Sequence, residues 1–509
     1  MFLVLPYVCL GLGLVCIVLT LIRTMHMFQL NSYKMNVQWN WLKKNAGKFR
    51  AQWMMLPLAG LAFPDSAVCH VVLSVLFLFF IPFLRPPQAK KPLVYTARVR
   101  RMLVTAAVLL VILSGVAVWL GEPFNYLLVC LGFALSPFLV LLVNVLNQPL
   151  EKAYVRYYIN DARKMLKSIP ALTVVGITGS YGKTSVKYYL NTLLRARFNV
   201  LMTPESYNTT LGVVRTIREN LRPTHEVFIC EMGARNVGDI KEICDIVRPK
   251  YGVLTAIGEQ HLESFKTLEN IVKTKFELAD SIPADGRVFL NDRIEKRPTQ
   301  PFATYGVAPD SDYAVGDIRV TRQGTSFNIR TPDGNAEFRT LLIGEHNVVN
   351  LAGAIAAAHS LGVPLDELKA QVLKIAPVPH RMQLIENGAM TIIDDAYNSN
   401  PNGCRAALKT LGMFDAFKVM ITPGMVELGA RQEACNCEFG REAAAVCDFV
   451  ALVGEEQTRP IRRGLLEAGY PEEKIFTAGS FNEAMAKVNS IDSEKRKVVL
   501  LENDLPDNY

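Results

Sequence analysis

Two different patterns of apolar residues divide the chain. Four stretches near the N-terminus are almost continuously apolar, namely Met1–Ile22, Ala67–Leu84, Met102–Leu120 and Asn125–Asn147. The hydrocarbon core of a bilayer is about 30 Å thick and takes ~20 such residues in a helix. Buried helices of a soluble domain are the alternative, but the scarcity of internal charges favours about four transmembrane spans over residues 1–150. The first run lacks a basic start and an A-x-A-like cleavage site, so a retained anchor is expected rather than a signal peptide.

After a linker helix expected over residues 151–170, short apolar runs alternate with helical patterns. Six runs predict strands of a first unit: LTVVGIT, HEVFICEMG, YGVLTAIG, GRVFLN, YAVGDIRV and TSFNIRT. Five more predict strands of a second unit: MTIIDDAY, FKVMITPG, FVALVGE, EKIFTAG and KVVLLEN. A helical pattern, HNVVNLAGAIAAAHSLG, ends at Gly362, and two prolines mark a break near Ile375–His380. Strands that alternate with helices predict mostly parallel α/β sheets, in domains at 171–376 and 377–509.

Charge is distributed as unevenly as hydropathy. Residues 1–168 contain 17 Lys and Arg against 4 Asp and Glu, whereas the remainder contains 38 against 43. Basic residues that flank apolar spans are typical of the cytoplasmic side of a membrane, where the lipids are anionic. They are not interleaved with aromatic residues as in a nucleic-acid platform, so no nucleic-acid partner is expected.

The basic segments also predict the orientation of the spans. GEPF, between the third and fourth apolar runs, has no basic residue and is expected outside, whereas RPPQAKKPLVYTARVRR and the segment after Leu150 are expected inside. This orientation places the soluble half in the cytoplasm. The basic loop Arg23–Asp65 conflicts with simple alternation, unless Trp53–Leu84 enters and returns as a hairpin that is broken near Pro64 and Asp65.

The ten cysteines contain no CxxC pair. The nearest approach to a metal motif is the CxC of Cys435 and Cys437, whose closest further thiol, Cys447, has no histidine beside it. Neither a metal site there nor a disulfide framework is expected, which fits a reducing compartment.

The stretch GITGSYGKTS, which follows the apolar run LTVV and leads into a helical pattern, is the main candidate for chemistry. Glycines in such a turn let backbone N–H groups converge on phosphate oxygens, and the helix N-terminus adds partial positive charge. Lys183 would hold the terminal phosphates, and Thr184 or Ser185 would hold Mg²⁺. An ordinary glycine-rich βα turn is the alternative, because the strict G-x-x-x-x-G-K-[ST] spacing requires glycine where Ile177 stands.

The glycines fit another known pattern. Gly176, Gly179, Gly182, Lys183 and Thr184 resemble the G-I-T-G-x-x-G-K-T loop of the Mur ligase family, the ATP-dependent amide ligases of peptidoglycan assembly. Six further segments resemble that family in the same order: TPESYNTTLGV, EMGARNVGDI, AIGEQHLESFKTLENIVKTKFEL, GEHNVVNLAGAIAAA, RMQLIENGAMTIIDDAYNSNP and PGMVELG. The second and third of these segments resemble the member of the family that adds D-alanyl-D-alanine. The resemblance implies a central P-loop ATP-binding domain followed by a Rossmann-like C-terminal domain, behind an α-helical membrane region.

The resemblance also implies roles for individual residues. It places the nucleotide against Gly179, Ser180, Tyr181, Gly182, Lys183, Thr184, Ser185, Asn347, Asn350, Arg381 and Asp395. It assigns two Mg²⁺ ions to Thr184, Glu231, His261 and a carbamate formed from Lys275 by CO₂. It assigns catalysis to Lys183, His261, Lys275 and Arg381, and substrate contacts to Asn208, Thr209, Tyr397 and Asn398.

Local alternatives stay open for some of these residues. Glu231 and His261 each follow an apolar strand run, at the strand ends where α/β sheets bind ligands, but a lone histidine is more often a capping or core residue. Asn347 would equally cap a helix after Gly344. Lys275 would equally be a solvated lysine on a helix face.

By resemblance, the γ-phosphoryl of ATP passes to a substrate carboxylate, and an amine attacks the acyl phosphate to give an amide, ADP and phosphate. The expected reactants are a muramoyl peptide or a lipid-linked acceptor, and D-alanyl-D-alanine or another amino component. Two departures bear on the acceptor: apolar spans stand where the family carries a UDP-sugar-binding domain, and ENDLPDNY replaces a lysine- and serine-bearing segment. The expected partners are the bilayer of a bacterial inner membrane and membrane proteins of cell-envelope synthesis.

Three other functions stay open from the sequence. A poly-γ-glutamate synthase subunit would be another membrane-associated relative of the Mur ligases. A non-catalytic ATP-binding membrane protein belongs to a different class, and would not be expected to keep Lys183, Thr184, Glu231, His261 and Lys275 together. A transporter ATPase would carry an apolar strand that ends in Asp, whereas HEVFICE ends in Glu.

Overall fold

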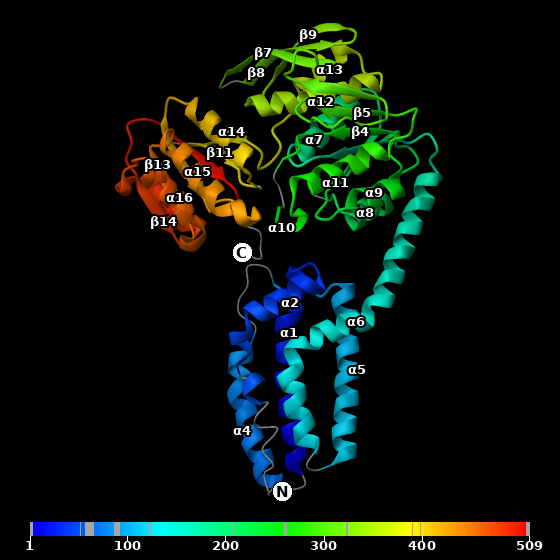
Figure 1. The fold of residues 1–509 in the computed structure, drawn as a ribbon, viewed down its shortest axis with the longest axis vertical. Helices are drawn as coiled ribbons and strands as arrows, with labels where there is room; N and C mark the ends of the chain where they lie inside the picture. The colour runs from blue at the N-terminus through cyan, green and yellow to red at the C-terminus, as the bar shows by residue number, and fades with distance from the viewer. Residues whose placement is uncertain are drawn as a thin grey trace. The chain divides into compact units, whose positions relative to one another are not determined.

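The computed structural model describes residues 4–50, 52–55, 66–85, 92–121, 124–205, 207–258, 262–321, 324–388, 390–397 and 399–504. The chain divides into two compact units, unit 1 at Met1–Tyr157 and unit 2 at Tyr158–Leu505. Figure 1 shows long helices in unit 1 and sheets flanked by helices in unit 2. The helical region expected at 1–150 and the α/β region expected from residue 171 therefore fall in different units.

Unit 1 is built from long helices: α1 (Leu5–Leu30), α4 (Ser66–Leu84), α5 (Ala97–Leu120) and the first part of α6 (Phe124–Lys167). A short helix, α2 (Met35–Lys44), and a turn, η2 (Ala46–Phe49), follow α1. By length and composition, α1, α5 and α6 are long and apolar enough to cross a membrane, whereas α4 is a shorter apolar helix over Val68–Leu84. The described residues thus contain three such helices, rather than the four expected from the sequence.

The helices of unit 1 do not simply alternate in direction. Contacts advance together along α1, α4 and α6: Gly13 with Val129, Ile17 with Gly132, His70 with Tyr126 and Phe77 with Phe133. These three helices therefore run the same way, and α5 runs against α6, since Arg101 pairs with Glu151 and Leu113 lies against Gly132. Parallel α1 and α4 exclude simple alternation of spans. The break expected near Pro64 and Asp65 lies outside the described residues.

Helix α6 passes without interruption from unit 1 into unit 2. The linker helix expected over 151–170 is its C-terminal part and is not a separate element. Within unit 2, Ala162 of α6 is fully buried in a core cluster, and Asp161 accepts a hydrogen bond of 2.6 Å from Arg218. The end of α6 is thus anchored by both apolar and charged contacts.

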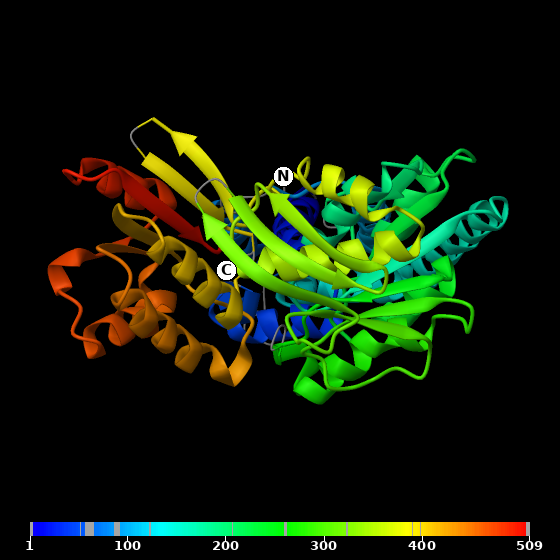
Figure 2. The same cartoon turned by 90° about the horizontal axis from the view of Figure 1, so that it is seen from above.

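Unit 2 begins with a nine-stranded sheet in the order β2-β3-β1-β4-β5-β6-β7-β8-β9. Its strands are β1 (Thr173–Thr178), β2 (Val200–Met202), β3 (Val227–Glu231), β4 (Tyr251–Leu254), β5 (Arg287–Asn291), β6 (Phe302–Gly306), β7 (Tyr313–Thr321), β8 (Gly324–Thr331) and β9 (Gly334–Thr340). Strands β2 to β7 pair in parallel in that order. Strands β7, β8 and β9 pair antiparallel and form the long edge ribbon seen in Figure 2.

Helices cover both faces of this sheet. One face carries α7 (Lys183–Leu194), α12 (Glu345–Ser360) and α13 (Leu365–Val372). The other carries α8 (Thr210–Asn220), α9 (Asp239–Val247) and α11 (Leu268–Asp280), with the single turn α10 (Leu262–Phe265) before α11. Strand β1 is buried on both sides, because Val174 belongs to one core cluster and Val175 to the other. Since β3, β1 and β4 are neighbours, their carboxyl ends meet at one edge, where open α/β sheets bind ligands.

The second sheet of unit 2 has six strands in the order β10-β11-β15-β12-β13-β14. They are β10 (Gln383–Asn387), β11 (Met390–Asp395), β12 (Phe417–Thr422), β13 (Phe449–Val453), β14 (Ile475–Ala478) and β15 (Lys497–Glu502). Its helices are α14 (Pro401–Gly412), α15 (Gln432–Ala444), α16 (Glu455–Glu467) and α17 (Phe481–Ser490), with short turns η3 (Gly429–Arg431) and η4 (Glu472–Lys474). Strand β15 comes last in the chain but lies between β11 and β12.

The eleven strands expected from the sequence are all present. Four further strands, β2, β6, β9 and β10, were not expected, and each pairs with an expected neighbour. The mostly parallel character of the first sheet is confirmed, apart from the antiparallel ribbon at its edge.

Candidate functional site

The glycine-rich loop connects β1 to α7, and two of its glycines have backbone angles that other residues rarely adopt. Gly179 has φ 152° and Gly182, the N-terminal cap of α7, has φ 80°. A Cβ at Gly179 would lie 1.9 Å from Thr255 Oγ1, and one at Gly182 would lie 2.3 Å from Asn350 Oδ1. The loop therefore passes close to β4 and α12 only because these positions carry no side chain.

If the loop binds ATP as the resemblance implies, replacing Gly179 with alanine should weaken that binding at least about tenfold, because the added methyl group displaces the loop from Thr255. Gly238→Ala is the matched control, since Gly238 has φ 95°, caps α9 and has open space around its Cβ position. Both variants should lose about 1–2 kcal/mol of folding free energy to the left-handed backbone. Calorimetric titration with ATP distinguishes the two variants, because only Gly179→Ala should lose affinity for ATP. Equal affinity of Gly179→Ala and the wild type would contradict a role of the loop in binding ATP.

Lys183, the first residue of α7, folds back over the loop. Its Nζ donates hydrogen bonds of 2.8 and 2.9 Å to the carbonyl oxygens of Gly179 and Ser180. Burial lowers the pKa of Lys183 to about 8; Glu231 opposes this shift and Arg381 adds to it. The ammonium is thus held inside the loop by weak neutral acceptors, which the anionic oxygens of a phosphate would replace.

Glu231 ends β3, beside the loop, and is 1% exposed. Thr184 Oγ1 and Asn208 Nδ2 each donate a 3.1 Å hydrogen bond to its Oε1, and Lys187 Nζ lies 2.9 Å from its Oε2. Burial alone would raise the pKa of Glu231, but Lys187, Lys183 and Asn208 outweigh burial, and the pKa lies below its ordinary value. Glu231 is therefore a buried carboxylate at physiological pH.

The groups around Glu231 fit a hard divalent cation. A carboxylate and a threonine hydroxyl are ligands that Mg²⁺ prefers, whereas Asn208 turns its amide N–H, a donor, toward the carboxylate of Glu231. His261, the other expected metal ligand, lies outside the described residues. Within the described ranges, no group of three or more His, Cys, Asp or Glu residues is placed to hold a metal ion. The fit to a metal therefore rests on Glu231 and Thr184.

Lys275 lies on α11 and is 3% exposed, so it is not a solvated surface lysine. Burial, with the nearby charge of Lys183, lowers the pKa of Lys275 to about 7. Its Nζ lies 5.9 Å from the centre of the Phe265 ring, and no hydrogen bond or ion pair joins it to the part of the chain that the structure describes. A fraction of this amine is uncharged near neutral pH, which few lysines are.

Asn347 and Asn350 lie on α12, which packs on α7. Asn347 is buried; its Oδ1 accepts a 2.8 Å bond from the Tyr189 hydroxyl, and its Nδ2 donates to the Ile343 carbonyl at 2.9 Å. Its amide is thus used in joining α12 to α7, and it does not cap the helix, whose cap is Gly344. Asn350 lies beside the loop at Gly182 and is the better placed of the two for a ligand there.

The second α/β part of unit 2 contributes Arg381, Asp395 and Tyr397. Arg381 stacks over the Tyr397 ring at 4.2 Å and is close enough to Lys183 to affect its pKa. Asp395 accepts a 3.2 Å bond from the Met382 N–H; burial raises the pKa of Asp395 to about 6, against the effect of Arg381. These residues bring a second cation to the loop. Asn398, expected at the substrate, lies outside the described residues.

The remaining expected residues have local roles. Ser180 Oγ donates to the Gly258 carbonyl at 2.9 Å, and the carbonyl of Tyr181 accepts a bond from Thr255. Ser185 is buried, and Thr209 caps α8 by accepting a bond of 3.3 Å from Gly212 N–H. Ser180 and Tyr181 therefore shape the loop, whereas Thr209 places Asn208 next to Glu231.

Sequence reasoning missed Lys187, which is fully buried and pairs with Glu231. Its ammonium also donates to the Glu205 carbonyl. The signal was available: Leu190 and Leu194 follow Lys187 at helical spacing, so a lysine occupies the apolar stripe of α7. A lysine at such a position indicates a buried partner of opposite charge.

It also missed Glu502, at the end of β15. Glu502 is paired in register with Asp395 and accepts a 2.5 Å bond from Ser399 Oγ. Burial, with the charge of Asp395, raises the pKa of Glu502 to about 8. Each of the two carboxyl groups therefore disfavours ionisation of the other. The sequence did mark this segment, since ENDLPDNY is where the chain departs from the resembled pattern.

Comparison with family models identifies two domains in unit 2. Residues 177–358 match the Mur ligase middle domain, and residues 380–502 match the glutamate ligase domain of Mur ligases. The first match contains the glycine loop, Glu231, Lys275 and α12, and the second contains Arg381 and Asp395. The two matches therefore divide the candidate site as the two sheets do.

Curated relatives are similar over the same region. The chain is 33% identical over 304 residues to UDP-N-acetylmuramoyl-tripeptide–D-alanyl-D-alanine ligase of Escherichia coli, a match that covers 57% of this chain and 66% of the relative. It is 28% identical over 273 residues to the enzyme of the same name from Bacillus subtilis, covering 52% of this chain and 59% of the relative. The chain thus spans between half and two thirds of the length of these curated relatives.

Solved structures are similar in fold. MurF from Acinetobacter baumannii superposes with a TM-score of 0.63 at 26% identity, over 69% of this chain and 77% of the other. MurF ligase from Thermotoga maritima in complex with ADP gives 0.62 at 26% identity, over 69% and 80%. Together with the two domain matches, which account for both sheets of unit 2, these similarities show that the chain belongs to the Mur ligase family.

Proposed function

We propose that the chain is an ATP-dependent amide ligase that joins D-alanyl-D-alanine to the carboxylate of a muramoyl tripeptide. The observation that carries this proposal is the convergence of Lys183, Thr184, Glu231, Lys275 and Arg381 around one glycine loop. Relatives named for this reaction are 28–34% identical to the chain over the region that contains the loop.

The described residues support transfer through an acyl phosphate. Lys183 would bind the terminal phosphates and neutralise charge as the phosphoryl group moves to the acceptor carboxylate. Arg381, held on Tyr397, would add a second positive charge from the C-terminal domain. Glu231 and Thr184 would hold Mg²⁺, which supplies charge neutralisation to the phosphate oxygens when bound. The incoming amine would then attack the activated carbonyl, and phosphate would leave.

Mass spectrometry of products tests the proposal directly. Full-length protein in detergent, with ATP and Mg²⁺, should convert UDP-muramoyl tripeptide and D-alanyl-D-alanine to the pentapeptide, with one ADP per product. Poly-γ-glutamate primers with glutamate, and a lipid-linked muramoyl tripeptide, are the parallel substrates. Extension of glutamate alone would reassign the chain to polymer synthesis, and reaction of the lipid-linked substrate alone would reassign the acceptor. ATP binding without any product would contradict a ligase.

We also propose that unit 1 anchors the ligase in the bacterial inner membrane, with unit 2 in the cytoplasm. The apolar helices α1, α5 and α6 support anchoring by length and composition. Many apolar side chains on their surfaces are exposed, among them Val104, Val111 and Trp119. The full chain should sediment with membranes and resist extraction by high salt and carbonate; release by carbonate would contradict an integral anchor.

We further propose that Lys275 reacts with CO₂ to form a carbamate that completes the metal site. Carbamate formation needs an uncharged amine, and the lowered pKa of Lys275, about 7, supplies one. The modification should therefore increase as the pH rises from about 6 to about 8 at constant CO₂ pressure. Incorporation of ¹³C-labelled CO₂, followed by NMR, measures it.

Lys275→Ala should lower kcat by about a hundredfold. Short carboxylic acids should restore part of the loss, because they return an anion to the site. Lys273→Ala, at an exposed position on the same helix, is the control and should keep wild-type activity. Full activity of Lys275→Ala, or absence of a ¹³C carbamate signal in the wild type, would exclude the modification.

A further inference from the structure

The charges of unit 1 are concentrated at one of its ends. Its described residues contain twelve Lys and Arg, and Glu151 is the one carboxylate among them. None of the twelve lies in the half of unit 1 that holds the N-terminal ends of α1, α4 and α6. The basic end is formed by the C-terminal end of α1, by α2, by the start of α5 and by α6 near Glu151.

The carboxylate of Glu151 is already neutralised. Arg101 of α5 donates to it from Nε at 2.7 Å and from Nη2 at 2.9 Å, in a bidentate pair between the two helices. The side chains are 28% and 15% exposed, so most of this pair is shielded from solvent. Further along, Asn147 Nδ2 donates to Thr105 Oγ1 at 2.9 Å. These contacts are complete polar links between α5 and α6.

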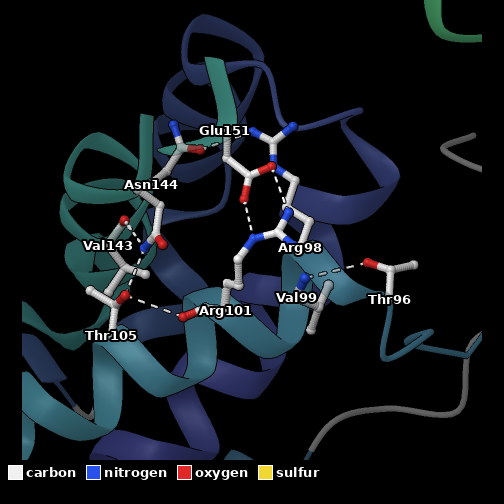
Figure 3. A network of polar contacts seen from close by, with 9 residues as sticks. Thr96, Arg98, Val99, Arg101, Thr105, Val143, Asn144 and Glu151 are labelled. Carbon is white, nitrogen blue, oxygen red and sulfur yellow. Dashed lines mark hydrogen bonds and ion pairs between the residues drawn. The ribbon is translucent and has the colours of Figure 1, made fainter. Parts of the chain in front are cut away.

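Arg98, one turn before Arg101, has no carboxylate partner in the described part of the chain. Its Nη2 donates to Asn144 Oδ1 at 3.1 Å, and its guanidinium lies 4.1 Å from the centre of the Tyr33 ring. Its Nε is buried and makes no hydrogen bond with any residue that the structure describes. Figure 3 shows the Arg98 and Glu151 side chains close together, but Glu151 bonds Arg101.

Asn144 and Tyr33 hold the guanidinium of Arg98 in a fixed place, and most of its N–H donors make no hydrogen bond with the described residues. A guanidinium has five N–H donors, and that of Arg98 makes a single hydrogen bond with the residues that the structure describes. Asn144 is 2% exposed and Tyr33 is held by a bond of 3.2 Å from Gln29, so both supports are themselves fixed. Arg98 and Arg101 share the single carboxylate of Glu151, so one positive charge is left over, and its partial burial is unfavourable unless another anion completes it.

The aromatic residues at this end are of the kind found at the level of lipid head groups. Trp39 is 44% exposed, with Lys43 over its ring, and Trp53 donates from its indole to the Ala46 carbonyl. Exposed tryptophans with lysines beside them are typical of the membrane–water interface, and basic pockets between spanning helices bind anionic head groups.

We propose that Arg98, with Tyr33 and Asn144, forms a binding site for the phosphate of an anionic phospholipid, between α5 and α6. The proposal rests on the membrane placement of unit 1 proposed above, and not on the ligase reaction. A planar guanidinium binds a phosphate by two parallel hydrogen bonds, which the spare donors of Arg98 allow. The alternative is that Arg98 only links α5 to α6, as Arg101 does.

Native mass spectrometry of the full chain distinguishes the two. Protein taken from nanodiscs of phosphatidylcholine and phosphatidylglycerol in equal amounts should retain phosphatidylglycerol after dilution into detergent. Arg98→Gln should lower this retention about tenfold. Arg100→Gln is the matched control, because it removes the same charge at an exposed position on the same helix. Equal retention by the wild type and Arg98→Gln, or an equal fall in both variants, would overturn the site.

Two further arms complete the test. If Arg98→Gln is too unstable to purify, Tyr33→Leu replaces it in the test. This variant leaves the bond between Arg98 and Asn144 in place and should lower retention of phosphatidylglycerol several-fold. Inorganic phosphate and glycerol 3-phosphate should leave retention unchanged; displacement of the lipid by either would assign the site to a free phosphate instead. Failure of the wild type to enter nanodiscs would count against membrane placement, and none of these readouts needs ligase activity.

Discussion

Replacement of Lys183 by alanine is expected to lower kcat by about a thousandfold or more, while the protein stays folded. Among the described residues, the Lys183 ammonium bonds the carbonyls of Gly179 and Ser180 and no others. Terminal phosphates of ATP would replace these acceptors, and the positive charge would then stabilise the phosphoryl group during transfer. Because the present bonds are local to the loop, their loss should cost little folding free energy.

The measurement is ADP release, with product mass and thermal unfolding followed on the same preparations. Lys369→Ala is the control, since Lys369 is an exposed lysine on α13 whose ion pair with Asp366 lies at the surface. It should behave as the wild type in all three assays. Turnover of Lys183→Ala at the wild-type rate would remove the loop from the mechanism, whatever its effect on ATP affinity.

Replacement of Lys187 by methionine is expected to cause the largest loss of stability, about 3–5 kcal/mol in the free energy of unfolding. The side chains of Lys187 and Glu231 are 0% and 2% exposed, and 2.9 Å separates Nζ from Oε2. Methionine keeps the volume but leaves a buried carboxylate without its main counter-charge. Urea unfolding of the variant and the wild type measures the difference.

The double variant Lys187→Met/Glu231→Gln separates the pair from the reaction. With neither charge present, the buried cost is removed, and a large part of the lost stability should return. Activity should not return, because Glu231 is also a proposed metal ligand. A double variant as unstable as Lys187→Met alone would show that packing of the lysine stem, rather than its charge, is what the fold requires.

The same pair predicts an inverted dependence on pH. In the wild type the pKa of Glu231 is lowered from 4.5, so its contribution to stability is present above that pH and is lost as the pH falls through the folded value. In Lys187→Met, burial should instead raise the pKa, and protonation would then relieve the buried charge. The deficit of the variant should therefore be smaller at about pH 5 than at about pH 8.

The strands around the site could be predicted because each has several apolar residues in a row. The unexpected strands lack that signal: β2 is three residues long, and β10 has no fully buried position. Strand β9, GNAEFRT, is mostly polar and buries only alternate side chains against β8. Such strands form because a neighbour offers paired backbone groups, which a sequence pattern does not record.

The candidate site was predictable through its motif, but not its internal contacts. The sequence placed Thr184 and Glu231 on separate segments, and the order β3-β1-β4 brings them within hydrogen-bond distance. Asn208 was expected at the substrate, where its role remains a prediction, and its amide bonds Glu231. Asn347 was expected at the nucleotide, where its role remains a prediction, and its amide bonds Tyr189 and Ile343. Contacts of this kind depend on strand order and helix packing, which local patterns leave open.

Membrane topology was the weakest part of the prediction for a related reason. Simple alternation fails because α1 and α4 run parallel, which is the direction that the alternative hairpin over Trp53–Leu84 requires. The buried contact of Gln52 with Thr20, at 3.0 Å, pairs a residue after α2 with the middle of α1. A hydropathy pattern does not predict that a polar segment such as the one around Gln52 packs against a helix.

The central place of β15 has a consequence for synthesis of the protein on the ribosome. The middle domain has all its strands once Thr340 is made, so it is able to fold while the chain is still growing. In the C-terminal sheet, β11 and β12 keep open edges facing each other until residues 497–502 emerge. During that interval two unpaired edges are exposed to other nascent chains, and pairing between them is a route to aggregation. The time at which β15 leaves the ribosome, rather than the stability of the finished sheet, would then limit the yield of folded C-terminal domain.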